Sequence, residues 1–64
     1  MIKVVFLRDK RTVEVEAKNV SDIFPKLSIL REQYVVIKNG RIVCEDESLS
    51  DGDTVELFTV ASGG

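Results

Sequence analysis

The sequence predicts an α+β fold in which one mixed sheet of four to five strands packs on one helix. Two apolar runs near the N-terminus alternate with a period of two, which is typical of strands. A stretch with helical spacing follows, and an Asn-Gly pair then stands between two further apolar runs. With 64 residues, of which 44% are hydrophobic, the chain has room for one domain with one core.

The first two runs predict a hairpin with one buried face. In "MIKVVFL" one face carries Ile2, Val4 and Phe6, and the other carries Lys3, Val5 and Leu7. "RDKR" is a polar turn. "TVEVEA" then places Val13, Val15 and Ala17 on one side, and Glu14 and Glu16 on the other. The buried face of this hairpin requires a cover.

The segment "VSDIFPKLSIL" predicts the helix that provides this cover. Ile23, Leu27 and Leu30 recur at helical spacing behind Ser21, which we expect to be the N-cap. Pro25 is expected near the helix start, where a missing N–H costs least.

"YVVIKNGRIVC" predicts a second hairpin, because Asn-Gly supplies the positive φ angles of a two-residue type I′ turn. In this hairpin Lys38 faces Arg41 and Ile37 faces Ile42. If the charged pair points outward, the inward residues are Val35, Ile37, Ile42 and Cys44, and the outward ones are Tyr34, Val36 and Val43. After an acidic loop, "DGD" turns the chain into a last strand with Val55 and Leu57 inward and Glu56, Phe58 and Val60 outward.

The expected order is strand, strand, helix, strand, short strand, strand. A helix crossing between the second and third strands puts the first and last strands side by side in the centre of the sheet. This is the β-grasp, or ubiquitin-like, architecture. We expect a single domain over residues 1–60 and a flexible Gly-Gly tail over residues 61–64, because glycine is costly to order and offers no side chain to pack.

Composition argues against several function classes. Cys44 has no histidine to activate it and is expected to face the core, and the chain contains no His and no metal-binding spacing, so neither a catalytic set nor a metal site is expected. No phosphate-binding glycine loop is present. A net charge of -2 and 6% aromatic residues argue against nucleic-acid binding. The N-terminal apolar run is too short for a signal peptide or a membrane helix, so we expect a cytoplasmic protein.

Charge is unevenly distributed along the chain. Residues 1–44 carry all nine Lys and Arg against five acids, whereas residues 45–64 carry six acids and no base. This acidic third either steers a basic partner or simply keeps a small protein in solution.

Two features indicate protein binding. The outward face of the predicted sheet carries Val5, Val36, Val43, Phe58 and Val60, which is more apolar surface than a solvated face requires. The alternative is that a loop covers some of them. The second feature is the tail, since residues 60–64 reach about 17 Å when extended. A docking patch and an inserting tail would act together.

"NGRIV", "DGDTVELFTV" and the terminal "SGG" resemble the small sulfur carriers of the ThiS and MoaD type, over essentially the whole chain. The resemblance implies a non-enzymatic carrier whose Gly64 carboxylate, next to Gly63, is adenylated by an ATP-dependent enzyme of the ThiF or MoeB type. A sulfur donor then converts it to a thiocarboxylate. The carrier itself would bind no cofactor, ATP being used by the enzyme, and Ala61 and Ser62 would enter the enzyme's channel with the tail.

The resemblance leaves several destinations for the sulfur. Molybdopterin carriers of the MoaD type are usually longer and often have Pro-Pro before the tail, so this chain is more similar to the ThiS carriers of thiamine biosynthesis. Relatives of this size also serve tRNA thiolation or are joined to lysines as ubiquitin-like modifiers. A different class, a non-catalytic interaction module with an incidental Gly-Gly end, also stays open. A stop codon directly after Gly64 would support use of the terminus.

Overall fold

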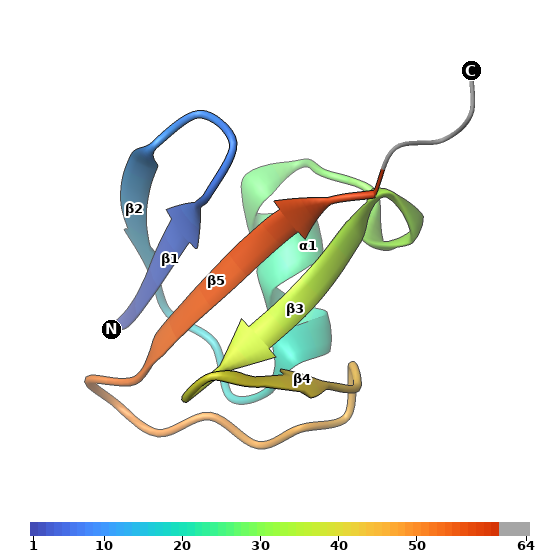
Figure 1. The fold of residues 1–64 in the computed structure, drawn as a ribbon. Helices are drawn as coiled ribbons and strands as arrows, with labels where there is room; N and C mark the ends of the chain where they lie inside the picture. Colours follow the sequence, from blue (N-terminus) through green and yellow to red (C-terminus); the bar gives the residue numbers. More distant parts are fainter. Residues whose placement is uncertain (61–64) are drawn as a thin grey trace.

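The computed structural model describes residues 1–60 as a five-stranded sheet packed on one short helix (Figure 1). The elements are β1 (Ile2–Phe6), β2 (Arg11–Val15), the 3-10 turn η1 (Val20–Asp22), α1 (Ile23–Leu27), the 3-10 turn η2 (Arg31–Gln33), β3 (Tyr34–Lys38), β4 (Arg41–Val43) and β5 (Thr54–Thr59). The strand order is β2-β1-β5-β3-β4, and β1 and β5 are parallel neighbours while the other pairs are antiparallel. The predicted β-grasp fold is confirmed.

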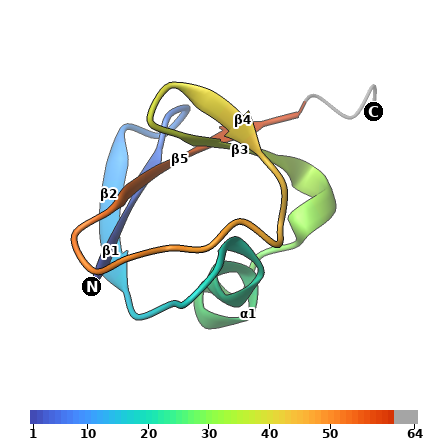
Figure 2. The ribbon, with the colours of Figure 1, turned by 90° about the horizontal axis from the view of Figure 1, so that it is seen from below.

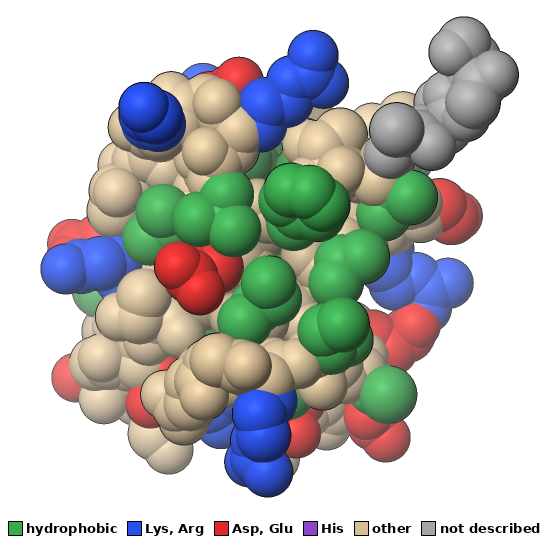
Figure 3. Space-filling view, viewed as in Figure 1, with side chains coloured by type: hydrophobic (Ala, Val, Ile, Leu, Met, Phe, Trp, Pro, Cys, Tyr) green, Lys and Arg blue, Asp and Glu red, His purple; other side chains and the backbone are tan. Residues whose placement is uncertain are grey.

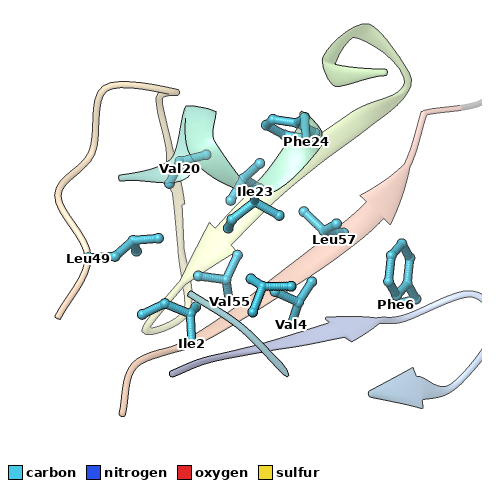
Figure 4. Packing of buried hydrophobic residues seen from close by; sticks show 11 residues of the cluster. Ile2, Val4, Phe6, Val20, Ile23, Phe24, Leu49, Val55 and Leu57 are labelled. Atoms are coloured by element: carbon cyan, nitrogen blue, oxygen red, sulfur yellow. The ribbon is translucent and has the colours of Figure 1, made fainter. Parts of the chain in front are cut away.

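The core lies between one face of the sheet and α1, which covers it from below (Figure 2). Ile2, Val4 and Phe6 of β1 and Val55 and Leu57 of β5 are at most 3% exposed, as the alternation predicts. Figure 4 shows these side chains directed toward Ile23 and Phe24 of α1. We call this buried side of the sheet the inner face and the opposite side the outer face.

The helix differs from the prediction in its start, length and buried residues. Ser21, the predicted N-cap, lies inside the 3-10 turn η1, which Asn19 caps by accepting a hydrogen bond of 3.1 Å from the Asp22 N–H. The N-cap of α1 itself is Asp22, whose side chain makes no capping hydrogen bond. The chain leaves the helix at Ser28, whose φ of +57° is left-handed. Leu30 therefore lies beyond the helical face and is 60% exposed, and Phe24 is buried instead.

The Asn39-Gly40 hairpin has the predicted turn and register but the opposite facing. Both turn residues have positive φ, and Lys38 pairs with Arg41 and Ile37 with Ile42. Val36 is buried, with Val43 and Tyr34 packed against the core, so the outward placement predicted for these three residues is wrong.

Placing the charged pair Lys38 and Arg41 on the outward face gave the wrong facing for the whole hairpin. Lys38 starts on the inner face, and its Nζ reaches the rim to lie 3.2 Å from Glu47 Oε2 and 3.0 Å from the Ser48 carbonyl oxygen. A long side chain at the end of a strand can keep its charge near water from either face. Ile42 and Cys44, predicted to face the core, are accordingly exposed.

The segment between β4 and β5 closes one side of the core. Its backbone bonds to the segment before α1, with the Val20 N–H donating to the Glu47 carbonyl at 3.0 Å and the Leu49 N–H to the Lys18 carbonyl at 2.9 Å. Leu49 is thereby buried beside Val20 (Figure 4). The predicted Asp-Gly-Asp turn then leads into β5, with Gly52 at a φ of +93°.

Candidate functional site

An apolar surface covers the outer face of the sheet. We define the outer patch as the apolar side chains that four segments place there: Val5 and Leu7 from β1 and its extension, Val35 and Ile37 from β3, Ile42 from β4, and Phe58 from β5. Phe58 is 53% exposed and Ile42 76%. Figure 3, which views this face, shows hydrophobic side chains gathered over the strands. Isolated apolar side chains are ordinary on a surface, but a contiguous group of them is typical of a docking site.

Strand pairing fixes how the outer patch is arranged. Val35 lies opposite Phe58, and Ile37 lies opposite both Glu56 and Ile42. Residues directly opposite each other on neighbouring strands point to the same face. Backbone hydrogen bonds therefore hold the patch in one arrangement, which lowers the entropy lost when a partner binds it.

The patch differs in part from the predicted docking surface. Val5 and Phe58 lie on the outer face as predicted, and Val60, just beyond β5, is 42% exposed. Val36 and Val43 belong to the inner side, and Val35, Ile37 and Ile42 take their place. Sequence reasoning missed Val35 and Ile37 because "YVVIK" is apolar on both faces, so its periodicity does not distinguish them. Ile42 was missed with them, because its facing follows from its partner Ile37.

The chain leaves the sheet at the edge of the outer patch. β5 ends at Thr59, and the Val60 N–H donates a hydrogen bond of 3.0 Å to the Gln33 carbonyl, which ties this exit to η2. A hollow of about 290 Å³ lies at the same end, lined by Leu7, Arg8, Phe58 and Thr59. The residues assigned to the tail, Ala61, Ser62, Gly63 and Gly64, lie outside the described residues.

Within residues 45–60, most acids of the acidic third form ion pairs. Glu45 pairs with Arg31, Asp51 with the N-terminal amine, and both Glu47 and Asp53 with Lys38. Most of these acids are therefore matched by bases from the first 44 residues. Asp46 and Glu56 differ, because within residues 1–60 no basic group forms an ion pair with either of them, and of the two only Glu56 lies on a strand of the sheet.

Residues 1–60 hold neither a cluster of metal-ligating side chains nor a membrane-spanning helix. Residues 1–60 contain no group of three or more metal-ligating side chains, and none of their ionisable side chains is buried. In the same range no helix has the length and apolar character needed to cross a bilayer. Cys44 is exposed, and no histidine exists to act as its base.

Comparison with known proteins establishes the family of the chain. The model of the ThiS family matches residues 3–64, nearly the whole chain. The chain belongs to the ThiS family.

Solved structures place this ThiS-family chain among β-grasp proteins. SAMP1 from Haloferax volcanii superimposes with a TM-score of 0.73 at 22% identity, covering 98% of each chain. A thiamine biosynthesis protein from Geobacter metallireducens superimposes with a TM-score of 0.58 at 25% identity, covering 97% of this chain and 87% of that one. The likeness to SAMP1 concerns the fold, whereas the family is established by the match along the sequence.

Proposed function

We propose that this ThiS-family protein is a sulfur carrier, a protein co-substrate rather than an enzyme, with Gly64 as the carboxyl terminus of its working form. The observation that carries the proposal is the position of the outer patch. The patch adjoins the end of β5, from which the chain continues to Gly63-Gly64, and the family match extends to residue 64. A partner docked on the patch would receive the terminus, because four residues extend by up to about 14 Å.

The partner in this proposal is an adenylating enzyme of the ThiF or MoeB type. A terminal carboxylate is a poor electrophile until it carries a good leaving group. A Gly64 carboxylate oxygen attacks the α-phosphorus of ATP and releases pyrophosphate. Sulfide supplied by a sulfur donor then attacks the acyl carbon: the C–S bond forms as the bond to AMP breaks, and loss of the S–H proton leaves a thiocarboxylate. ATP belongs to the enzyme, and the carrier contributes the docking surface and the reacting terminus.

Thiazole formation in thiamine biosynthesis is the proposed destination of the sulfur. Two observations support it: the family match and the thiamine biosynthesis protein among the similar structures. The acceptor can be tested by adding the thiocarboxylated protein to a thiazole synthase reaction and measuring thiazole product. If no thiazole product forms, and sulfur is instead transferred to tRNA or the protein is joined to lysines through Gly64, the same terminus serves a different pathway.

The carrier chemistry is tested by intact mass. The protein is incubated with ATP, an adenylating enzyme of the ThiF or MoeB type and a sulfur donor. We expect a mass gain equal to the exchange of one oxygen for sulfur, and no gain in a variant that lacks Gly64. Absence of the gain with several such enzymes would contradict the proposal and favour a simple interaction module.

A further inference from the structure

Glu56 is an acidic residue in the middle of the outer patch. It is on β5, the central strand of the sheet, with Val5 opposite on one side and Ile37 opposite on the other. Phe58, two residues further along β5, points to the same face. Figure 3 shows acidic atoms between the hydrophobic groups of this face. Three of the nearest neighbours of Glu56 on this face are thus apolar.

The Glu56 side chain is partly buried and forms no ion pair within residues 1–60. A carboxylate in this position keeps its hydration only while the face is open to water. Any partner that covers the outer patch removes that water, and an unpaired carboxylate in an apolar interface is costly. A partner avoids this cost by placing a cation against the carboxylate.

A second copy of the chain would bring its own Glu56 into the same interface, and the base on its outer face, Lys3, already lies opposite Glu14. A two-fold dimer through this face would apply the same surface to itself, so both Glu56 carboxylates would enter the interface near its axis. The apolar side chains would match, but the two Glu56 carboxylates would repel each other, since no base belongs to the outer patch.

We propose that Glu56 selects the partner of the outer patch: an apolar surface of another protein that carries one Lys or Arg opposite Glu56, and not a second copy of this chain. The proposal rests on the proposed function in taking the adenylating enzyme as this partner. It adds the chemistry that the enzyme's docking surface must have.

The first test measures self-association and needs no partner. Sedimentation equilibrium compares the wild-type protein with Glu56→Leu and with Glu14→Leu. Glu14 is a matched control, because it is on the outer face but on the edge strand β2, opposite Lys3. We expect only Glu56→Leu to dimerise at concentrations where the wild type is monomeric. If Glu56→Leu stays monomeric, or if the wild-type protein dimerises through this face, Glu56 does not prevent self-association through the outer patch, and that part of the proposal is overturned.

The second test measures affinity for the adenylating enzyme by titration calorimetry. Glu56→Gln keeps the size of the side chain and removes its charge, and we expect binding about tenfold weaker with a reduced dependence on salt. Glu14→Gln should change affinity less than about twofold. Equal or tighter binding by Glu56→Gln would overturn the proposed cation. If the wild-type protein binds the enzyme but is never adenylated, the proposed function is contradicted. The self-association and affinity measurements on the Glu56 variants would still test the inference about Glu56.

Discussion

Gly40 shows how one residue can fix a hairpin through its backbone alone. Its φ is +79°, and a Cβ placed there would have no heavy atom within 4 Å. A side chain at this position would therefore meet no steric clash with the rest of the protein. Its cost would come entirely from the left-handed backbone conformation, which L-residues with a Cβ disfavour.

Gly40→Ala should lower the free energy of unfolding by about 1 kcal/mol, because alanine pays the left-handed penalty that glycine avoids. Urea denaturation followed by circular dichroism measures this change. An unchanged or increased stability would show that the turn does not require a left-handed residue at position 40.

Gly64 carries the chemistry in our proposal, so its substitution should separate activation from folding. Gly64→Val adds a branched side chain at the residue that must enter the enzyme's channel, and restricts its backbone. We expect adenylation, measured as ATP–pyrophosphate exchange, to fall at least about a hundredfold, with an unchanged unfolding midpoint. Exchange at the normal rate would contradict the role of Gly64.

β3 is the element in which sequence reasoning and structure differ most. Hairpin register, strand order and the buried residues of β1 and β5 were predictable, because the Asn-Gly turn and a clean alternation specify them locally. The facing of β3 was not, since both its faces are apolar and the ion pairs of Lys38 form with a segment distant in the sequence. Leu49 was missed for the same reason, because only tertiary contacts bury it.

A pair of substitutions tests the facing of β3. Val36 packs in the core between its strand neighbours Val43 and Leu57, whereas Val35 lies on the outer patch. Val36→Asp should destabilise the protein by about 3 kcal/mol or more, because it buries an unpaired charge, and Val35→Asp by about 1 kcal/mol at most. Chemical denaturation compares the two. Equal losses, or a larger loss for Val35→Asp, would contradict the assigned faces.

At the scale of the whole molecule, the inner and outer faces of the sheet have different roles. The inner face, α1 and the segment before β5 enclose the core, and ion pairs fasten that segment to the sheet and to the N-terminus. The outer face carries no covering element within residues 1–60 (Figure 2). Because β5 contributes Phe58 to the outer patch and then leads to the C-terminal residues, docking and presentation of the terminus are coupled through one strand.

The coupling of docking and activation is the central claim, and one comparison of rates tests it most directly. Phe58 and Leu30 are exposed to similar degrees, 53% and 60%, but Leu30 lies between α1 and η2 and is not one of the residues that define the outer patch. The measurement is kcat/KM for adenylation of the wild type, Phe58→Ala and Leu30→Ala by the adenylating enzyme. We predict a loss of about tenfold or more for Phe58→Ala, mainly through KM, and less than about twofold for Leu30→Ala. Equal rates for the two variants would contradict docking through the outer patch.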